Sequence, residues 1–104
     1  MSKEDAWRLL SESRKEIDSI DVQLLELLNR RSRVVEQIGK AKEEMEMPIY
    51  EPKREEDVFR NVMEHNHGPL PTEAVKAFFE RFIDEMRTLQ RMRCEQKKQG
   101  EKEC

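Results

Sequence analysis

Apolar residues recur along the first part of the chain in alternating steps of three and four, which is the spacing of one face of a helix. The residues of this apolar seam are Leu10, Ile17, Ile20, Leu24, Leu27, Val34, Ile38, Ala41 and Met45. No proline interrupts the segment, and Gly39 is its only internal glycine. The pattern predicts one very long helix from about Lys3 to Met45.

Two shorter helices are predicted after the long one. Pro48 and Pro52 punctuate a short connection, and Pro52 is placed to be the first residue of a second helix that ends near His65. A cluster of helix-breaking residues follows at 67–71, and Thr72 is a natural N-cap for a third helix. The third helix has an apolar stripe of Val75, Phe78, Phe79, Phe82, Ile83, Met86 and Leu89. No strand is predicted, so the expected fold class is all-α with three helices per chain.

The end of the chain lacks such a stripe. No apolar residue recurs after residue 94 until the final cysteine, and most of the intervening residues are charged. A segment that buries no apolar surface does not offset the entropy of ordering its backbone. The sequence therefore predicts a helical domain over residues 1–94 and a charged, disordered tail over residues 95–104.

The length of the first helix predicts a dimer. About forty residues at ~1.5 Å each give a helix of roughly 60 Å, whereas a compact domain of this size has a radius of gyration of ~13 Å. Such a helix extends beyond its own subunit, and the apolar seam of its projecting half needs a partner helix. A twofold dimer is the simplest arrangement, although an inert coiled-coil or adapter protein would have the same pattern. Polar residues on the buried faces distinguish these alternatives.

Arg31 stands in the seam where an apolar residue is expected. A guanidinium taken out of water costs several kcal/mol unless an anion meets it, and no acidic residue occupies this seam. A counter-ion from elsewhere in the chain, or a helix register that exposes Arg31, is the ordinary alternative. We interpret Arg31 as a candidate contact for an anionic ligand.

Polar residues also adjoin core positions on every predicted helix. They are Arg14 and Lys42 on the first, Arg54 and Glu55 on the second, and Gln90 on the third. Taken singly, cations beside a seam usually form salt bridges or extend along the surface, and charges in a first helical turn suit the helix dipole. Their occurrence together with Arg31 favours a binding site.

Composition and charge exclude several classes of protein. Charged residues make up 41% of the 104 residues, so the core of a monomer would be thin. Lys and Arg number 20 against 23 Asp and Glu, and this balance argues against a nucleic-acid partner. No stretch approaches the ~20 apolar residues of a membrane span, and the N-terminus lacks the apolar core of a signal peptide. We therefore expect no membrane partner and a cytoplasmic location.

The cysteines and histidines indicate neither a disulfide framework nor a metal site. Two unpaired thiols, Cys94 and Cys104, suit a reducing compartment. His65 and His67 are two residues apart, so on a helix they point to different sides. A metal site that combines them with the cysteines is therefore not expected.

Four segments resemble the all-helical (type II) chorismate mutase family. They are RKEIDSID at 14–21, LLELLNRR at 24–31, GKAK at 39–42 and YEPKRE at 50–55. The resemblance extends from about Leu10 to Gln90, and it implies an intertwined homodimer of three-helix subunits. It also implies an isomerase that converts chorismate to prephenate by a Claisen rearrangement, on the route to phenylalanine and tyrosine. This reaction is unimolecular and is expected to need no nucleophile, metal or cofactor.

The resemblance assigns roles at the reacting ether bond and the ring hydroxyl. Lys42 would contact a substrate carboxylate and the ether oxygen, and Gln90 would donate a second hydrogen bond to that oxygen. Glu55 would accept a hydrogen bond from the ring hydroxyl, helped by the backbone at Glu51. Arg54 would add positive charge and order the surrounding loop.

The resemblance assigns the two substrate carboxylates to Arg31 and Arg14, since the planar fork of arginine suits a carboxylate. These two arginines are seventeen residues apart, which is ~25 Å along a helix. Because one small molecule cannot span that distance, Arg14 is expected to come from the other subunit.

Two positions depart from the family pattern. Met86 stands where many bacterial members have a serine, and a thioether cannot donate a hydrogen bond to a carboxylate. Glu51 stands where aspartate is commoner.

Two alternatives of related fold remain open: an isochorismate-pyruvate lyase, and a regulatory domain that binds the substrate without turnover. The inert helical adapter remains as a third.

Overall fold

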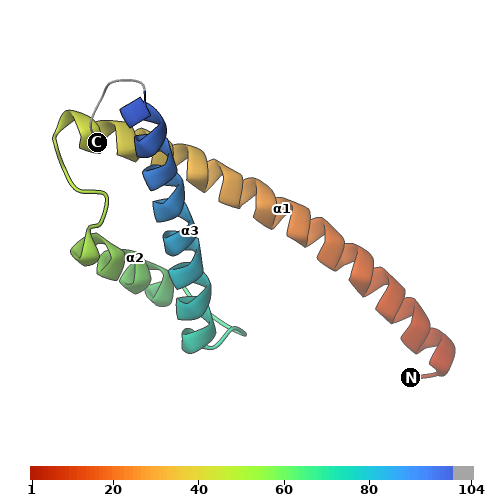
Figure 1. Cartoon of the computed structure of the whole chain (residues 1–104). Coiled ribbons are helices and arrows are strands. Elements are labelled where there is room, and N and C mark those ends of the chain that lie inside the picture. The colour runs from red at the N-terminus through yellow and green to blue at the C-terminus, as the bar shows by residue number, and fades with distance from the viewer. Residues whose placement is uncertain (100–104) are drawn as a thin grey trace. The chain divides into compact units, whose positions relative to one another are not determined.

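Residues 1–99 form three helices, as the sequence predicts. The structure, a computed structural model, describes residues 1–99, with side chains to residue 96. Helix α1 is Lys3–Glu44, α2 is Pro52–Glu64 and α3 is Thr72–Gln99 (Figure 1). The described residues contain no strand, so the predicted all-α class with a very long first helix is confirmed.

Helix α1 ends in a turn that reverses the chain. The backbone N–H of Met47 donates to the carbonyl of Lys42 at 2.8 Å, and the N–H of Glu46 donates to that of Glu43 at 3.1 Å. This pair of hydrogen bonds is the Schellman arrangement, in which one residue adopts a left-handed conformation. Here that residue is Glu46, with a φ of 55°. The connection that follows this turn contacts Lys42 again through Ile49 and Glu51.

Helices α2 and α3 begin beside prolines. Pro52 is the first residue of α2, with Glu51 at the N-cap position. At the start of α3, the carbonyl of Pro71 accepts hydrogen bonds from Ala74 at 3.0 Å and Val75 at 3.2 Å. The capping residue is therefore Pro71, one residue before the predicted Thr72. The difference arises because the backbone carbonyl of Pro71 receives these N–H groups, and Thr72 lies inside the helix.

The chain divides into two compact units, residues 1–34 and residues 35–104. The first unit is the greater part of α1 and contains no buried residue. Its large apolar side chains are exposed: Trp7, Leu9, Leu10, Ile17, Ile20, Val22, Leu24, Leu25, Leu27 and Val34. The predicted apolar seam is thus present on this unit, and the unit by itself provides nothing to cover it.

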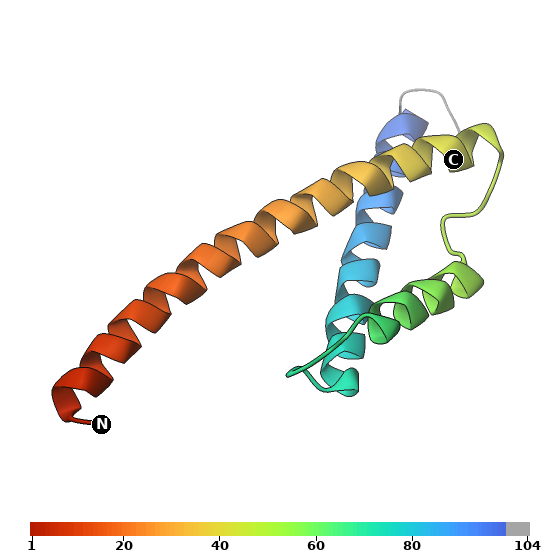
Figure 2. The ribbon, with the colours of Figure 1, turned by 180° about the vertical axis from the view of Figure 1, so that it is seen from behind.

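The second unit contains the end of α1 together with α2 and α3. Helices α2 and α3 pack against each other, as both views show (Figure 2). Among the described residues only Val75 and Met86 are buried hydrophobic residues, at 7% and 6% exposure. The rings of Phe79 and Phe82 meet edge to face, with centroids 5.3 Å apart. This small core agrees with the thin core expected from the high content of charged residues.

Helix α3 continues beyond the predicted end of the helical domain. It runs to Gln99, so residues 95–99 of the predicted disordered tail are helical, while residues 100–104 lie outside the described residues. The physical reason is that Glu, Gln and Lys have high helix propensities and extend an established helix without apolar contacts.

Cys94 departs from the prediction of two unpaired thiols. It is disulfide-bonded in the structure, so the prediction is wrong for this residue, and Cys104 lies outside the described residues. Over the described part of the chain, no helix combines the length and apolar character that a bilayer crossing requires.

Candidate functional site

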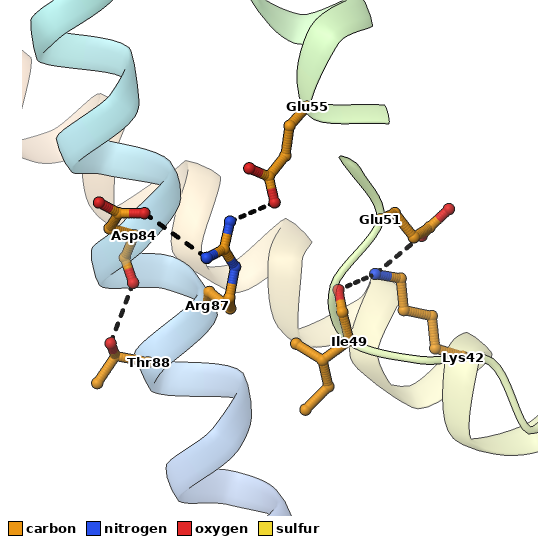
Figure 3. A network of polar contacts seen from close by, with 7 residues as sticks. All are labelled: Lys42, Ile49, Glu51, Glu55, Asp84, Arg87 and Thr88. Atoms are coloured by element: carbon orange, nitrogen blue, oxygen red, sulfur yellow. Dashed lines mark hydrogen bonds and ion pairs between the residues drawn. The ribbon is translucent and has the colours of Figure 1, made fainter. Parts of the chain in front are cut away.

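Lys42 ties the last turn of α1 to the connection that follows it. Its ammonium Nζ donates to the backbone carbonyl of Ile49 at 2.8 Å and forms an ion pair with Glu51 Oε1 at 2.8 Å (Figure 3). The side chains of Lys42 and Glu51 are 12% and 30% exposed. An ammonium has three N–H donors, so one donor remains beyond these two contacts with described residues. The predicted site lysine is therefore well shielded and held in a defined position.

Glu55 lies in the first turn of α2 and is paired with a cation of α3. Its carboxylate Oε2 accepts a hydrogen bond from Arg87 Nη2, and the two side chains are 24% and 20% exposed (Figure 3). The Arg87 guanidinium also lies 4.8 Å from the centroid of the Tyr50 ring, within the range of a cation–π contact. Arg87 thus connects α3 with both α2 and the connection before it.

The sequence reasoning missed Arg87. The residue lies four positions after Ile83 and three before Gln90, so it shares the side of α3 that carries the apolar stripe. A cation at such a position is the same signal that identified Arg31 on the first helix. The position of Arg87 beside the apolar stripe could be seen in the sequence. Its pairing with Glu55 could not, because Glu55 is 32 residues away along the chain.

Gln90 contacts the part of α1 that belongs to the second unit. Its amide Nε2 lies 3.4 Å from the backbone carbonyl of Val35, which makes a long hydrogen bond. A Cβ added at Gly39 would lie 3.9 Å from the same Nε2, which is ordinary van der Waals contact. One turn further along α3, Arg93 Nη1 donates to the carbonyl of Glu36 at 3.0 Å. These contacts hold this part of α3 against α1 residues 35–39.

The remaining predicted residues differ in their surroundings. Arg54 is exposed on α2, and Met86 is buried in the core of the second unit. Arg14 is exposed and Arg31 is half-buried, both on the α1 segment of the first unit. Arg31 takes part in an interaction within the chain. Its assignment to a ligand therefore rests on the family pattern and not on a missing anion.

The second unit also has an open groove lined by α2 and the start of α3. Its volume is about 520 Å³, and its lining residues are Glu56, Phe59, Arg60, Met63, Glu64 and Lys76. It includes none of the predicted site residues. Within the described residues there is no group of three His, Cys, Asp or Glu side chains that could hold a metal ion.

Comparison with known proteins connects this arrangement to one family. The family model described as chorismate mutase type II matches residues 13–91. A bifunctional chorismate mutase/prephenate dehydratase of Aquifex aeolicus is 35% identical over 86 residues, covering 79% of this chain and 24% of that protein. A protein of the same name from Neisseria gonorrhoeae is 37% identical over 83 residues, covering 80% of this chain and 22% of that protein.

A solved structure from Thermus thermophilus, a chorismate mutase (form II), is similar in fold. Its TM-score is 0.77 at 33% sequence identity, covering 79% of this chain and 93% of the other. The chain spans about a quarter of the length of the curated relatives described above. The family match covers α2, most of α1 and α3 up to Arg91, and so includes Lys42, Glu55 and Gln90. The chain therefore belongs to the type II chorismate mutase family.

Proposed function

We propose that this chain is a chorismate mutase, an isomerase that converts chorismate to prephenate. The observation that carries the proposal is the placement of Lys42, Glu55 and Gln90 in one compact helical unit. Each of these side chains is half-buried and has a defined polar contact. The names of the relatives, which include chorismate mutase, support the same activity.

The reaction needs positioning and electrostatic stabilisation. Holding the enolpyruvyl arm over the ring lowers the entropic part of the barrier. As the ether bond to the ring breaks, negative charge develops on the ether oxygen, and fixed hydrogen-bond donors stabilise it. In our proposal Lys42 and Gln90 supply these donors. The contacts of Lys42 with Ile49 and Glu51 support this role, because they fix the ammonium before the substrate arrives.

The substrate carboxylates are assigned to arginines. Arg31 binds one carboxylate, and Arg14 of the partner subunit binds the other. Both arginines lie on one continuous helix, and their separation of ~25 Å supports a shared site, because one chain cannot bring both to one small molecule. Arg54 adds positive charge nearby. By the family pattern Met86 replaces a serine that contacts the substrate. It is buried in the core of the second unit and a thioether donates no hydrogen bond, so substrate binding should be weaker than in members with serine.

The homodimer is part of the proposal. In the first unit, the exposed apolar side chains of α1 form a stripe that a second copy of the same helix would cover. Covering this stripe also takes Arg31 further out of water, which strengthens its attraction for a carboxylate. The cytoplasmic location remains a prediction of the sequence.

The proposal is tested by incubating the purified chain with chorismate and, separately, with isochorismate. We expect prephenate from chorismate. Pyruvate released from isochorismate, without prephenate from chorismate, would identify a lyase and contradict the proposal. Binding of chorismate measured by calorimetry, without turnover, would identify a regulatory domain, and absence of both would favour an inert helical adapter.

A further inference from the structure

We propose that Arg87 is a positioning residue, which holds the Glu55 carboxylate so that it accepts a hydrogen bond from the ring hydroxyl of the substrate. The inference rests on the proposed function, in which Glu55 receives that hydroxyl. Arg87 itself acts through Glu55 and contacts no reacting atom.

Arg87 holds the Glu55 carboxylate through one of its two oxygens. Arg87 donates to Oε2 of Glu55, and among the described residues no contact to Oε1 occurs. A carboxylate accepts through both oxygens, so Oε1 remains available for a ligand hydroxyl. A charge-assisted hydrogen bond from a planar guanidinium also restricts the rotation of the carboxylate. Arg87 therefore selects one orientation of Glu55 from the several rotamers of a long side chain.

Arg87 is itself held by its surroundings. Its guanidinium lies 4.8 Å from the Tyr50 ring centroid, and Nη1 lies 3.7 Å from Asp84 Oδ1 on the preceding turn of α3. The Asp84 side chain is 66% exposed, so this second ion pair is weak. The Arg87 side chain is 20% exposed. Tyr50 lies between Ile49 and Glu51 in the sequence, and Lys42 contacts both of these neighbours (Figure 3). Lys42 and Arg87 thus hold one short segment, residues 49–55, from α1 and from α3.

Loss of the Glu55 hydrogen bond should affect KM more than kcat, because the ring hydroxyl lies outside the reacting bonds. This hydroxyl is not part of the bond that breaks or of the bond that forms, so its hydrogen bond to Glu55 is about equally strong in the bound substrate and in the transition state. Loss of such an interaction raises KM and leaves kcat almost unchanged. A purely structural defect would instead reduce the fraction of folded enzyme, which lowers kcat at unchanged KM.

The test compares Arg87→Met with Arg81→Met in steady-state conversion of chorismate. Arg81 is a matched control, since it lies on the same helix and pairs with Glu85, but its side chain is 76% exposed. We expect Arg87→Met to raise KM about tenfold or more with kcat within about threefold, and Arg81→Met to change neither. Arg87→Lys keeps the charge but not the planar fork, so its KM should lie between those of the wild type and Arg87→Met.

A double-mutant cycle with Glu55→Gln shows whether Arg87 acts through Glu55. We expect Arg87→Met to have no further effect on KM in the Glu55→Gln background, because the oriented carboxylate is already absent. A general effect of removing one positive charge near a dicarboxylate would persist in that background, and this result would overturn the inference. An active wild type with an unchanged KM in Arg87→Met would overturn it as well, whereas an inactive wild type would contradict the proposed function itself.

Discussion

Lys42 has more proposed partners than free donors. Ile49 and Glu51 occupy two of its three N–H groups, and the proposed reaction assigns it a substrate carboxylate and the ether oxygen. One of the present partners must therefore give way when the substrate binds. The Glu51 carboxylate, whose side chain is 30% exposed, carries the same charge as the substrate carboxylate, so exchange of Glu51 for the substrate conserves the charge pairing.

Replacement of Lys42 removes a donor to the ether oxygen. We expect Lys42→Met to lower kcat by about a hundredfold or more, the scale known for single donors to a developing oxyanion. Lys40→Met is a suitable control, because Lys40 is exposed on the same helix. Steady-state kinetics of both variants checks the prediction. Equal losses in the two variants would indicate a general effect of charge.

Gln90 provides a test that depends on pH. A glutamate in its place donates a hydrogen bond only when its carboxyl group is protonated, so the activity of Gln90→Glu should be present in acid and fall as pH rises through the pKa of the new carboxyl group. The measurement is a profile of kcat against pH for the wild type and the variant. A variant with the pH profile of the wild type would show that no donor is needed at this position.

At the scale of the helices, the ends are determined by local backbone chemistry. Proline at the start of α2 follows directly from the sequence, whereas the end of α1 does not, because Glu46 adopts the left-handed conformation that glycine usually provides. Likewise α3 runs to Gln99 with charged residues that the apolar pattern could not assign to a helix. Apolar periodicity identifies which segments are helical, and the exact ends depend on the turn geometry.

The strained turn after α1 gives a stability prediction. Glycine adopts a positive φ without the steric cost of a side chain, so Glu46→Gly should raise the free energy of unfolding by roughly 1 kcal/mol. Glu44→Gly serves as a control, since Glu44 is within the helix and its replacement should lower stability by a similar amount. The shift in the urea midpoint at an unchanged slope measures both effects. A destabilised Glu46→Gly variant would contradict the strain argument.

At the scale of the whole molecule, the exposed stripe of the first unit and the thin core of the second both favour a dimer. A protein that exposes this much apolar surface gains stability by pairing with a second copy. In the proposed dimer each active site takes residues from both chains, so that a single chain lacks a complete set of arginines. Assembly and activity would then be coupled.

Mixed dimers test the shared site. Arg14→Ala and Arg31→Ala should each abolish most turnover, and Arg31→Ala should leave the dimer intact, because it removes a charge from an apolar seam. After the two inactive variants are unfolded together and refolded, heterodimers should regain one working site, because both substitutions fall in the other site. Recovery of activity in the mixture, with dimers measured by light scattering, checks this. Intact heterodimers without activity would mean that the sites are not shared.

The sequence by itself determined the helical class, the number of helices in the described residues, the starts of α1 and α2, and the family pattern from which the site residues are predicted. These properties are local, because helical periodicity, proline and short motifs act over a few consecutive residues. Only the tertiary structure decided which side chains pair: Lys42 with Glu51, and Arg87 with Glu55 across α2 and α3. Such pairs join residues that are far apart in the chain or separated by an irregular connection, so their geometry depends on how the backbone turns between them. In the sequence, Arg87 is recognisable only as a cation on the side of α3 that carries the apolar stripe. Its pairing with Glu55 is visible only in the folded chain.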